Sequence, residues 1–136
     1  MLKLIGFDAD DTLWHSEVYF RTAHDAFEKI LANYLDLSNV KVHEHLLDVE
    51  RRNIKLFGYG AKGMTLSMLE TAISITNERI SAKHLHEIIG LGKEVLLHPV
   101  SLIDGIEQAV KDIAKEYQVV LITKGDLFHQ ESKVAQ

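Results

Sequence analysis

The stretch Ile5-Gly6-Phe7-Asp8-Ala9-Asp10-Asp11-Thr12-Leu13 places three carboxylates directly after a short apolar segment. That segment begins at Leu2 and has one charged break, at Lys3. A short apolar run that ends in a turn is typical of a buried strand in a parallel sheet. The three aspartates disfavour the interior of a helix or strand and favour a loop. The sequence therefore predicts a strand whose end leads directly into an acidic loop.

A second apolar segment, residues 119–122, ends in the same way, at Thr123-Lys124-Gly125-Asp126. Strand and helix patterns at both ends of the chain favour parallel pairing of the two strands. Open sheets bind ligands at the carboxyl ends of such strands. We therefore expect the aspartates of the first strand to come within reach of Thr123.

Between the strands, apolar residues recur at steps of three and four, which predicts helices. The first helix is expected from about Glu17 with Ser16 as its cap, the second over residues 42–56, and the third up to about Ile80. The fourth begins near Ser81 and can break at Gly90 and Gly92. The fifth is capped by Asp104, with Glu107 nearly completing a capping box. The residues expected to point inward are, helix by helix, Ala23, Ala26, Phe27, Ile30, Leu31 and Tyr34; Leu46, Val49, Asn53 and Leu56; Leu66, Leu69, Ile73, Thr76 and Ile80; Leu85, Ile88, Ile89, Val95 and Leu96; Ile106, Val110, Ile113 and Tyr117.

The helical block is too long to be a simple crossover between two strands. We predict an α/β fold with a Rossmann-like parallel-sheet core, residues 1–15 and 99–136, and an inserted all-helical domain, residues 16–98. Two strands are few for a stable open sheet. Open apolar strand edges favour self-association.

Composition excludes several classes of protein. The 136 residues are 46% hydrophobic and 26% charged, as in an ordinary globular domain. A net charge of −5 argues against a general nucleic-acid binder. The absence of cysteine excludes disulfides and thiolate chemistry. No apolar run approaches the roughly 20 residues of a membrane span, and the first one meets acidic residues too early for a signal peptide. We expect a cytoplasmic protein that binds neither membranes nor nucleic acid.

The acidic loop has a definite chemistry. Two close carboxylates, Asp8 and Asp10, repel each other unless a cation lies between them. An all-oxygen site suits Mg²⁺, which keeps waters and pairs with phosphate. With a phosphoryl group bound, one carboxylate can attack and the other can transfer protons, while Thr123 and backbone N–H groups hold phosphoryl oxygens.

The residues 5–13 resemble the first signature of the haloacid dehalogenase-like hydrolase superfamily, apolar residues followed by Asp-x-Asp-x-Thr. Residues 120–125 resemble its second signature, and the helical block resembles its cap. The resemblance implies a phosphatase of a small phosphorylated metabolite, with Asp8 as nucleophile and Asp10 as acid/base. It further implies Mg²⁺ bound by the Asp8 carboxylate and the Asp10 carbonyl, and substrate phosphate bound by Thr123 and Lys124.

The sequence departs from that family pattern after Thr123. The third signature, a lysine on a later strand, and the fourth, an acidic pair, have no clear counterpart, and Lys124 and Lys133 lie too close to the second signature. We therefore expect an N-terminal portion of a longer enzyme or a natural truncation, with weak or absent activity of this chain alone. Two alternatives are a signalling receiver domain phosphorylated on aspartate and a non-catalytic helical interaction module.

Other motifs have simpler explanations. Asp11 serves the site or caps the following turn, and Trp14 lines the site entrance or packs in the core. The series Gly58-x-Gly60-x-x-Gly63 matches a dinucleotide fingerprint, but no strand precedes it, so a loop between helices is expected. Tyr59 and Lys62 in that loop either contact substrate or face solvent. The pairs His43/His45 and His84/His86 point about 200° apart on a helix and cannot share an ion.

Overall fold

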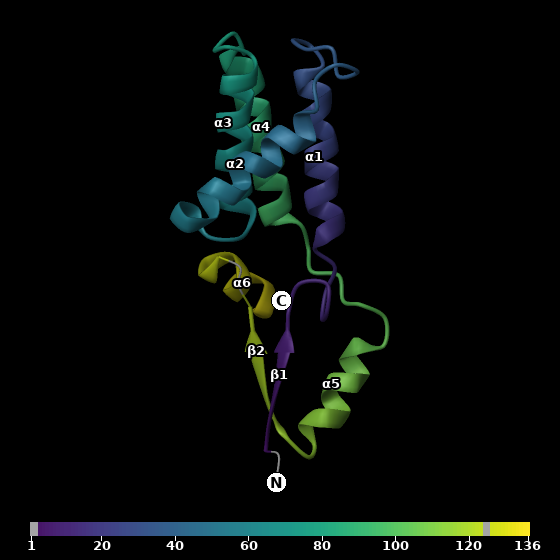
Figure 1. Cartoon of the computed structure of the whole chain (residues 1–136). Helices are drawn as coiled ribbons and strands as arrows, with labels where there is room; N and C mark the ends of the chain where they lie inside the picture. The colour runs from purple at the N-terminus through teal and green to yellow at the C-terminus, as the bar shows by residue number, and fades with distance from the viewer. Residues whose placement is uncertain (1–2, 124–125) are drawn as a thin grey trace.

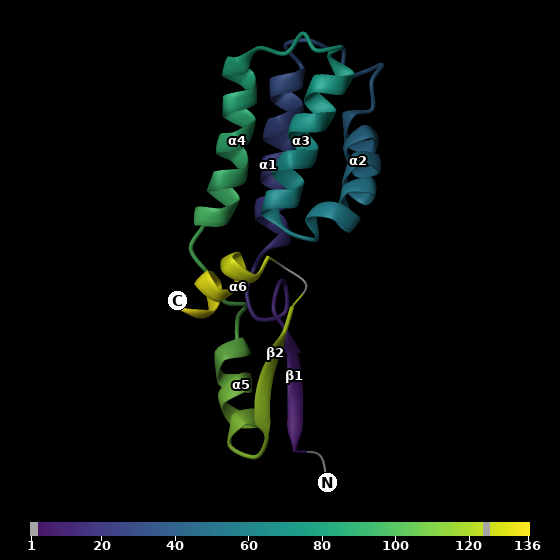
Figure 2. The ribbon, with the colours of Figure 1, turned by 90° about the vertical axis from the view of Figure 1, so that its left-hand side faces the viewer.

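A computed structural model describes residues 3–123 and 126–136 of the chain, so Lys124 lies outside the described residues. Four helices lie at one end of an elongated molecule, and two strands with one helix lie at the other (Figure 1). A last short helix lies between these two parts in both ribbon views (Figure 2). The chain is therefore a mixed α/β protein that is mostly helical.

The sheet consists, among the described residues, of β1 (Leu4–Asp8) and β2 (Gln118–Ile122). The strands are parallel, as predicted, and the register pairs Leu4 with Gln118 and Asp8 with Ile122. The expectation that they are buried is wrong, since Leu4 is 52% and Ile122 63% exposed. Besides β1, helix α5 packs against β2, and among the described residues Leu4, Leu121 and Ile122 of the two strands stay exposed.

The four-helix part contains α1 (Glu17–Leu31), α2 (Val42–Phe57), α3 (Ala61–Ile75) and α4 (Ala82–Leu97). They enclose one apolar core, formed by Ala23, Phe27, Leu31, Val42, Leu46, Ala61, Met64, Met68, Ala72, Ile80, Ile88 and Val95. Helix α4 is not broken at its glycines. A Cβ at Gly92 would lie 1.9 Å from the Oγ1 of Thr65, so glycine lets α3 and α4 approach closely.

The predicted inward face of α3 is wrong for part of its length. Leu66 and Ile73 are exposed, whereas Met64, Met68 and Thr71 are buried. Apolar residues occur on every side of this helix, so their spacing does not identify the face that packs. In α2 the predicted inward position of Leu56 is wrong, since this side chain is 76% exposed in the last turn before the loop at Gly58.

Two predicted helix caps are also wrong. The Ser16 side chain makes no capping hydrogen bond to α1. Helix α5 (Ile106–Ala114) begins after Gly105, whose φ of 78° places it in the left-handed region, so Asp104 does not cap the helix. The apolar stripe of α5 is half-buried because this helix covers a sheet of only two described strands.

Two chain segments that join the helices to the sheet run side by side. The His15 N–H donates to the carbonyl of Ser101 at 2.9 Å, and the Ile103 N–H donates to the carbonyl of Leu13 at 3.0 Å. Trp14 is buried in this region, which confirms its packing role. Among the described residues no helix is both long and apolar enough to cross a membrane.

Candidate active site

Asp8 is the last residue of β1, and its side chain is exposed. Its Oδ2 accepts a hydrogen bond from the Thr12 hydroxyl at 3.0 Å. Since β1 and β2 are parallel and Asp8 pairs with Ile122, the residue that follows β2, Thr123, lies at the same edge of the sheet. An exposed carboxylate with one hydroxyl partner is open to an approaching electrophile.

The Asp10 carboxylate is held by three donors. Its Oδ1 accepts hydrogen bonds from the Lys133 Nζ at 2.8 Å and the Trp14 Nε1 at 2.9 Å. Its Oδ2 accepts one from the Gln130 Nε2 at 3.0 Å. The Lys133 side chain is 12% exposed and also lies 5.9 Å from the centre of the Trp14 ring. Asp10 therefore has a fixed orientation.

Gln130 joins the two strand ends. The same Nε2 that donates to Asp10 also donates to the Thr123 hydroxyl, at 2.6 Å. The Gln130 side chain is buried, and among the described residues its Oε1 has no hydrogen-bond partner. Asp10 and Thr123 are thus brought together, as the sequence predicted, through a residue that the sequence analysis did not identify.

The environment of Asp10 favours its ionised form. Partial burial by itself raises the pKa of Asp10, but the hydrogen bonds from Lys133 and Trp14, the positive charge of Lys133 and the Gln130 amide together lower it below its usual value. Asp10 is therefore a carboxylate at neutral pH.

Asp11 caps α1. Its φ of 60° turns the backbone, and its carboxylate accepts hydrogen bonds from the N–H groups of Ser16, at 2.9 Å, and Glu17, at 3.1 Å. A carboxylate is favourable at a helix N-terminus, both as hydrogen-bond acceptor and through the helix dipole. Of the two roles predicted for Asp11, the structure therefore confirms that of a cap for the following turn.

Helix α6 (Leu127–Val134) brings Gln130 and Lys133 to the site. It begins at Asp126, whose Oδ2 accepts from the His129 N–H at 3.0 Å and from the Lys62 Nζ at 3.0 Å. These contacts, the backbone one first, lower the pKa of Asp126. Lys62 thus connects the four-helix part to the strand end, and the glycine loop joins α2 to α3 as predicted.

Sequence reasoning missed Gln130, and it considered Lys133 only as a counterpart of the family's lysine and set it aside. Their spacing of three residues places them on one face of a helix, and Asp126 is a recognisable cap for that helix. Those two signals predict that both side chains point back to the strand end. The identity of their target, Asp10, depends on the tertiary fold and was not readable from spacing.

Asp8 and Asp10 are the residues of this site that could supply oxygen ligands to a divalent cation. The Asp8 carboxylate is exposed. Among the described residues, no backbone N–H outside the regular helices and strands donates to the Asp10 carbonyl. The Asp10 carboxylate is already occupied by Lys133, Trp14 and Gln130. The described residues contain no group of three or more His, Asp or Glu side chains arranged to hold a metal ion. A cation here would keep several waters, as Mg²⁺ does.

Comparisons with known proteins identify the family. A model of haloacid dehalogenase-like hydrolases matches residues 2–136. A haloacid dehalogenase-like family hydrolase from Xanthomonas campestris is 58% identical, with a TM-score of 0.92 over 99% of this chain and 56% of that one. No curated protein matches the sequence.

Two more distant structures share the fold. A 2-haloacid dehalogenase from Pseudomonas syringae pv. Tomato DC3000 is 24% identical, with a TM-score of 0.56 over 96% of this chain and 60% of that one. A predicted phosphoglycolate phosphatase from Haemophilus somnus 129pt is 17% identical, with a TM-score of 0.52 over 98% and 57%. This chain spans just over half the length of the structures it resembles. The sequence signatures, the fold and the family match agree, and the chain belongs to the haloacid dehalogenase-like hydrolases.

Proposed function

We propose that this protein is a Mg²⁺-dependent phosphatase that hydrolyses a small phosphate monoester through an aspartyl-phosphate on Asp8. The observation that supports this most is the shared Gln130 amide, which brings Asp10 and Thr123 together beside the exposed end of β1. A nucleophile, a base and a phosphoryl-oxygen donor are the parts that acyl-phosphate chemistry needs.

In the first step an Asp8 oxygen attacks phosphorus. A phosphorus–oxygen bond to Asp8 forms, the bond to the ester oxygen breaks, and that oxygen leaves with the electron pair. The proposal assigns the phosphoryl oxygens to the strand end where the Thr123 hydroxyl accepts the Gln130 amide N–H. In the second step water attacks the aspartyl-phosphate, the Asp8 oxygen leaves as carboxylate, and inorganic phosphate is released.

Asp10 is suited to the second step. Asp10 is ionised, so it can take the proton of the attacking water and pass it to solvent, and the ion pair with Lys133 that lowers its pKa makes it a weaker base than an ordinary aspartate. In the first step the same ion pair opposes the protonated form that a general acid needs. A leaving group that is stable as an anion needs no proton, so p-nitrophenyl phosphate should react faster than an alkyl phosphate.

The residues present fit Mg²⁺ as a partial ligand set. The Asp8 carboxylate and the Asp10 carbonyl would hold the ion, and substrate phosphate and water would complete its ligands. When bound, the ion offsets the negative charge of the phosphoryl oxygens and of Asp8. The Gln130 Oε1 beside Asp10 is buried and lacks a hydrogen-bond partner among the described residues.

The test is a single-turnover assay with p-nitrophenyl phosphate and protein in excess, so that slow turnover remains visible. We expect Mg²⁺-dependent release of p-nitrophenolate that Asp8→Asn abolishes. Asp10→Asn should slow the release of phosphate by about 10²–10⁴-fold. Asp112→Asn, an exposed position on α5, is the matched control and should leave both rates unchanged. Release that persists in Asp8→Asn, or release that does not depend on Mg²⁺, would contradict the proposal.

A further inference from the structure

The contacts of Gln130 fix the orientation of its side-chain amide. This side chain is 3% exposed on α6, and its Nε2 donates to Asp10 Oδ2 at 3.0 Å and to the Thr123 hydroxyl at 2.6 Å. A carboxylate that carries no proton can only accept hydrogen bonds, so the nitrogen of the amide has to face Asp10. The two N–H groups of one amide are therefore directed at the ends of both strands.

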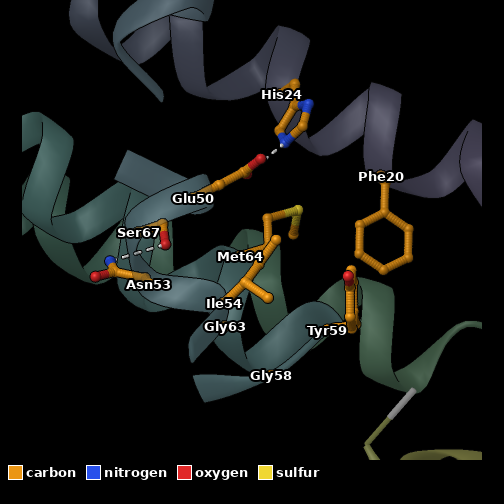
Figure 3. A pocket seen from close by; sticks show the side chains of 11 residues that line it. Phe20, His24, Glu50, Asn53, Ile54, Gly58, Tyr59, Gly63, Met64 and Ser67 are labelled. Carbon is orange, nitrogen blue, oxygen red and sulfur yellow. Dashed lines mark hydrogen bonds and ion pairs between the residues drawn. The ribbon is translucent and has the colours of Figure 1, made fainter. Parts of the chain in front are cut away.

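That orientation leaves the carbonyl end of the amide unsatisfied. Gln130 Oε1 is buried and has no hydrogen-bond partner among the described residues. The helical part shows a contrast, because its buried His24 Nε2 and Glu50 Oε1 face each other at 3.3 Å (Figure 3). A buried acceptor without a partner lowers stability, and an apolar side chain of similar length, such as methionine, would avoid that cost. Such an atom calls for an explanation other than stability, and the two contacts of the amide supply one.

The helix that carries Gln130 is held at its start and again one turn further on. Asp126 caps α6 by accepting from the His129 N–H at 3.0 Å, and Lys133 donates to the other oxygen of Asp10, Oδ1, at 2.8 Å. The Asp10 carboxylate is thus attached to α6 through both of its oxygens, and Gln130 extends this attachment to the end of β2. Movement of one strand end relative to the other would break a contact of the buried amide.

We propose that Gln130 is a positioning residue for phosphoryl transfer, which sets the place of Asp10 relative to the strand end at Thr123. The inference rests on the proposed phosphatase function and adds to it a residue that acts through Asp10 and Thr123 without touching the substrate. In that function the phosphoryl oxygens lie at the Thr123 end and the proton of the water goes to Asp10, so the distance between these two residues decides how well the water is aligned. A displacement of about 1 Å is enough to slow such a step by about 100-fold.

The first experiment measures the link between the strand ends without turnover. Trp14 is the only tryptophan, and its indole N–H donates to Asp10 Oδ1 at 2.9 Å, so one ¹⁵N–¹H signal reports on the Asp10 carboxylate. Thr123→Val removes one of the two acceptors of Gln130, and we expect it to shift the Trp14 signal. In the Gln130→Met background the same substitution should cause no further shift. Equal shifts in both backgrounds, or no shift while Gln130 is present, would overturn the inference.

The second experiment measures whether this link serves the reaction. With p-nitrophenyl phosphate and Mg²⁺, Gln130→Met should lower the single-turnover rate at saturating ester by about 10–100-fold and change the half-saturating concentration by less than about threefold. Glu131→Met, at the exposed position next along α6, is the matched control and should change neither the rate nor the Trp14 signal. Gln130→Asn keeps an amide that is too short by one carbon–carbon bond to reach both oxygens. It should behave like Gln130→Met, and it serves where that variant does not fold.

The two proposals fail separately. A rate that Gln130→Met leaves unchanged, or a higher half-saturating concentration at an unchanged rate, would overturn the positioning role and leave the phosphatase intact. Release of p-nitrophenolate that persists in Asp8→Asn would overturn the phosphatase, and the Trp14 signal would still decide whether Gln130 links the strand ends.

Discussion

Replacing Lys133 with methionine tests the polar cluster around Asp10. The substitution keeps the length and apolar stem of the side chain but removes the charge that donates to Asp10 Oδ1 at 2.8 Å. Asp10 would retain its donors Trp14 and Gln130, so its carboxylate would stay oriented while losing its ion pair.

The expected loss of unfolding free energy depends on how exposed the Lys133 and Asp10 side chains are. A hydrogen bond to a charged group contributes about 1.5–3 kcal/mol when buried, whereas exposed ion pairs contribute about 0–1 kcal/mol. Lys133 is 12% exposed but Asp10 is 35% exposed, so water screens the pair. We expect Lys133→Met to lower the free energy of unfolding by about 1–1.5 kcal/mol at pH 7, between those limits.

The pH dependence has a defined sign. The folded-state pKa of Asp10 lies below its ordinary value of 3.8, so its stabilisation is present above that pH and is lost as the pH falls through the folded-state pKa. The difference between wild type and variant should therefore disappear at low pH. The pKa of Asp10 itself should rise in the variant, because burial then acts with fewer opposing contacts.

Urea unfolding at a series of pH values measures the difference, and a double-mutant cycle with Asp10→Asn isolates the pairwise part. Lys111→Met is the matched control, since Lys111 makes an exposed ion pair with Glu107 on α5, and it should cost no more than about 0.5 kcal/mol. Unchanged stability of Lys133→Met, or a loss that persists at low pH, would refute the reasoning.

Three further predictions concern stability. Gly92→Ala should destabilise the protein by about 1–3 kcal/mol in urea unfolding, because the new Cβ would overlap Thr65. Gly90→Ala is the control, since its Cβ meets no atom within 4 Å, and it should stabilise α4 by about 1 kcal/mol. Equal effects of the two substitutions would contradict the packing of α3 on α4. Asp11→Ala removes the cap of α1 and should cost about 1 kcal/mol, with unchanged stability as the contrary result. Burial and the nearby Lys133 lower the pKa of His129 below 6.5, although two nearby aspartates act in the opposite direction. The free energy of unfolding should therefore fall as the pH drops from 6.5 through the folded-state pKa of His129. In His129→Gln that pH dependence should vanish, and a dependence that remains would show that another group causes it.

The positions of the two strand ends could be predicted from the sequence, but the contacts between residues far apart in the chain could not. Asp8 and Thr123 could be placed at one edge because each follows a short apolar run and parallel strands align their carboxyl ends. The ion pair of Asp10 with Lys133 joins residues 123 positions apart, and no local pattern predicts which carboxylate the lysine reaches.

Similar limits explain the errors in the helices. In α1 the apolar residues occupy one face, so Phe27 and Leu31 were correctly placed in the core. In α3 apolar residues surround the helix, and only packing against α2 and α4 decides that Met68 is buried while Leu66 is exposed. Strand burial was overestimated for a comparable reason, since Ile122 is apolar but little in the described chain covers it. The domain boundaries and the roles of the site residues stay predictions.

The most direct test of the account is whether Asp8 accepts a phosphoryl group. Protein mixed with Mg²⁺ and p-nitrophenyl phosphate is quenched in acid, reduced with borohydride to convert an acyl phosphate to the alcohol, digested and sequenced by mass spectrometry. We predict that position 8 alone is converted to homoserine and that omission of the ester leaves it as aspartate. Conversion at Asp10 or Asp11, or an unmodified Asp8 while p-nitrophenolate is released, would contradict the account.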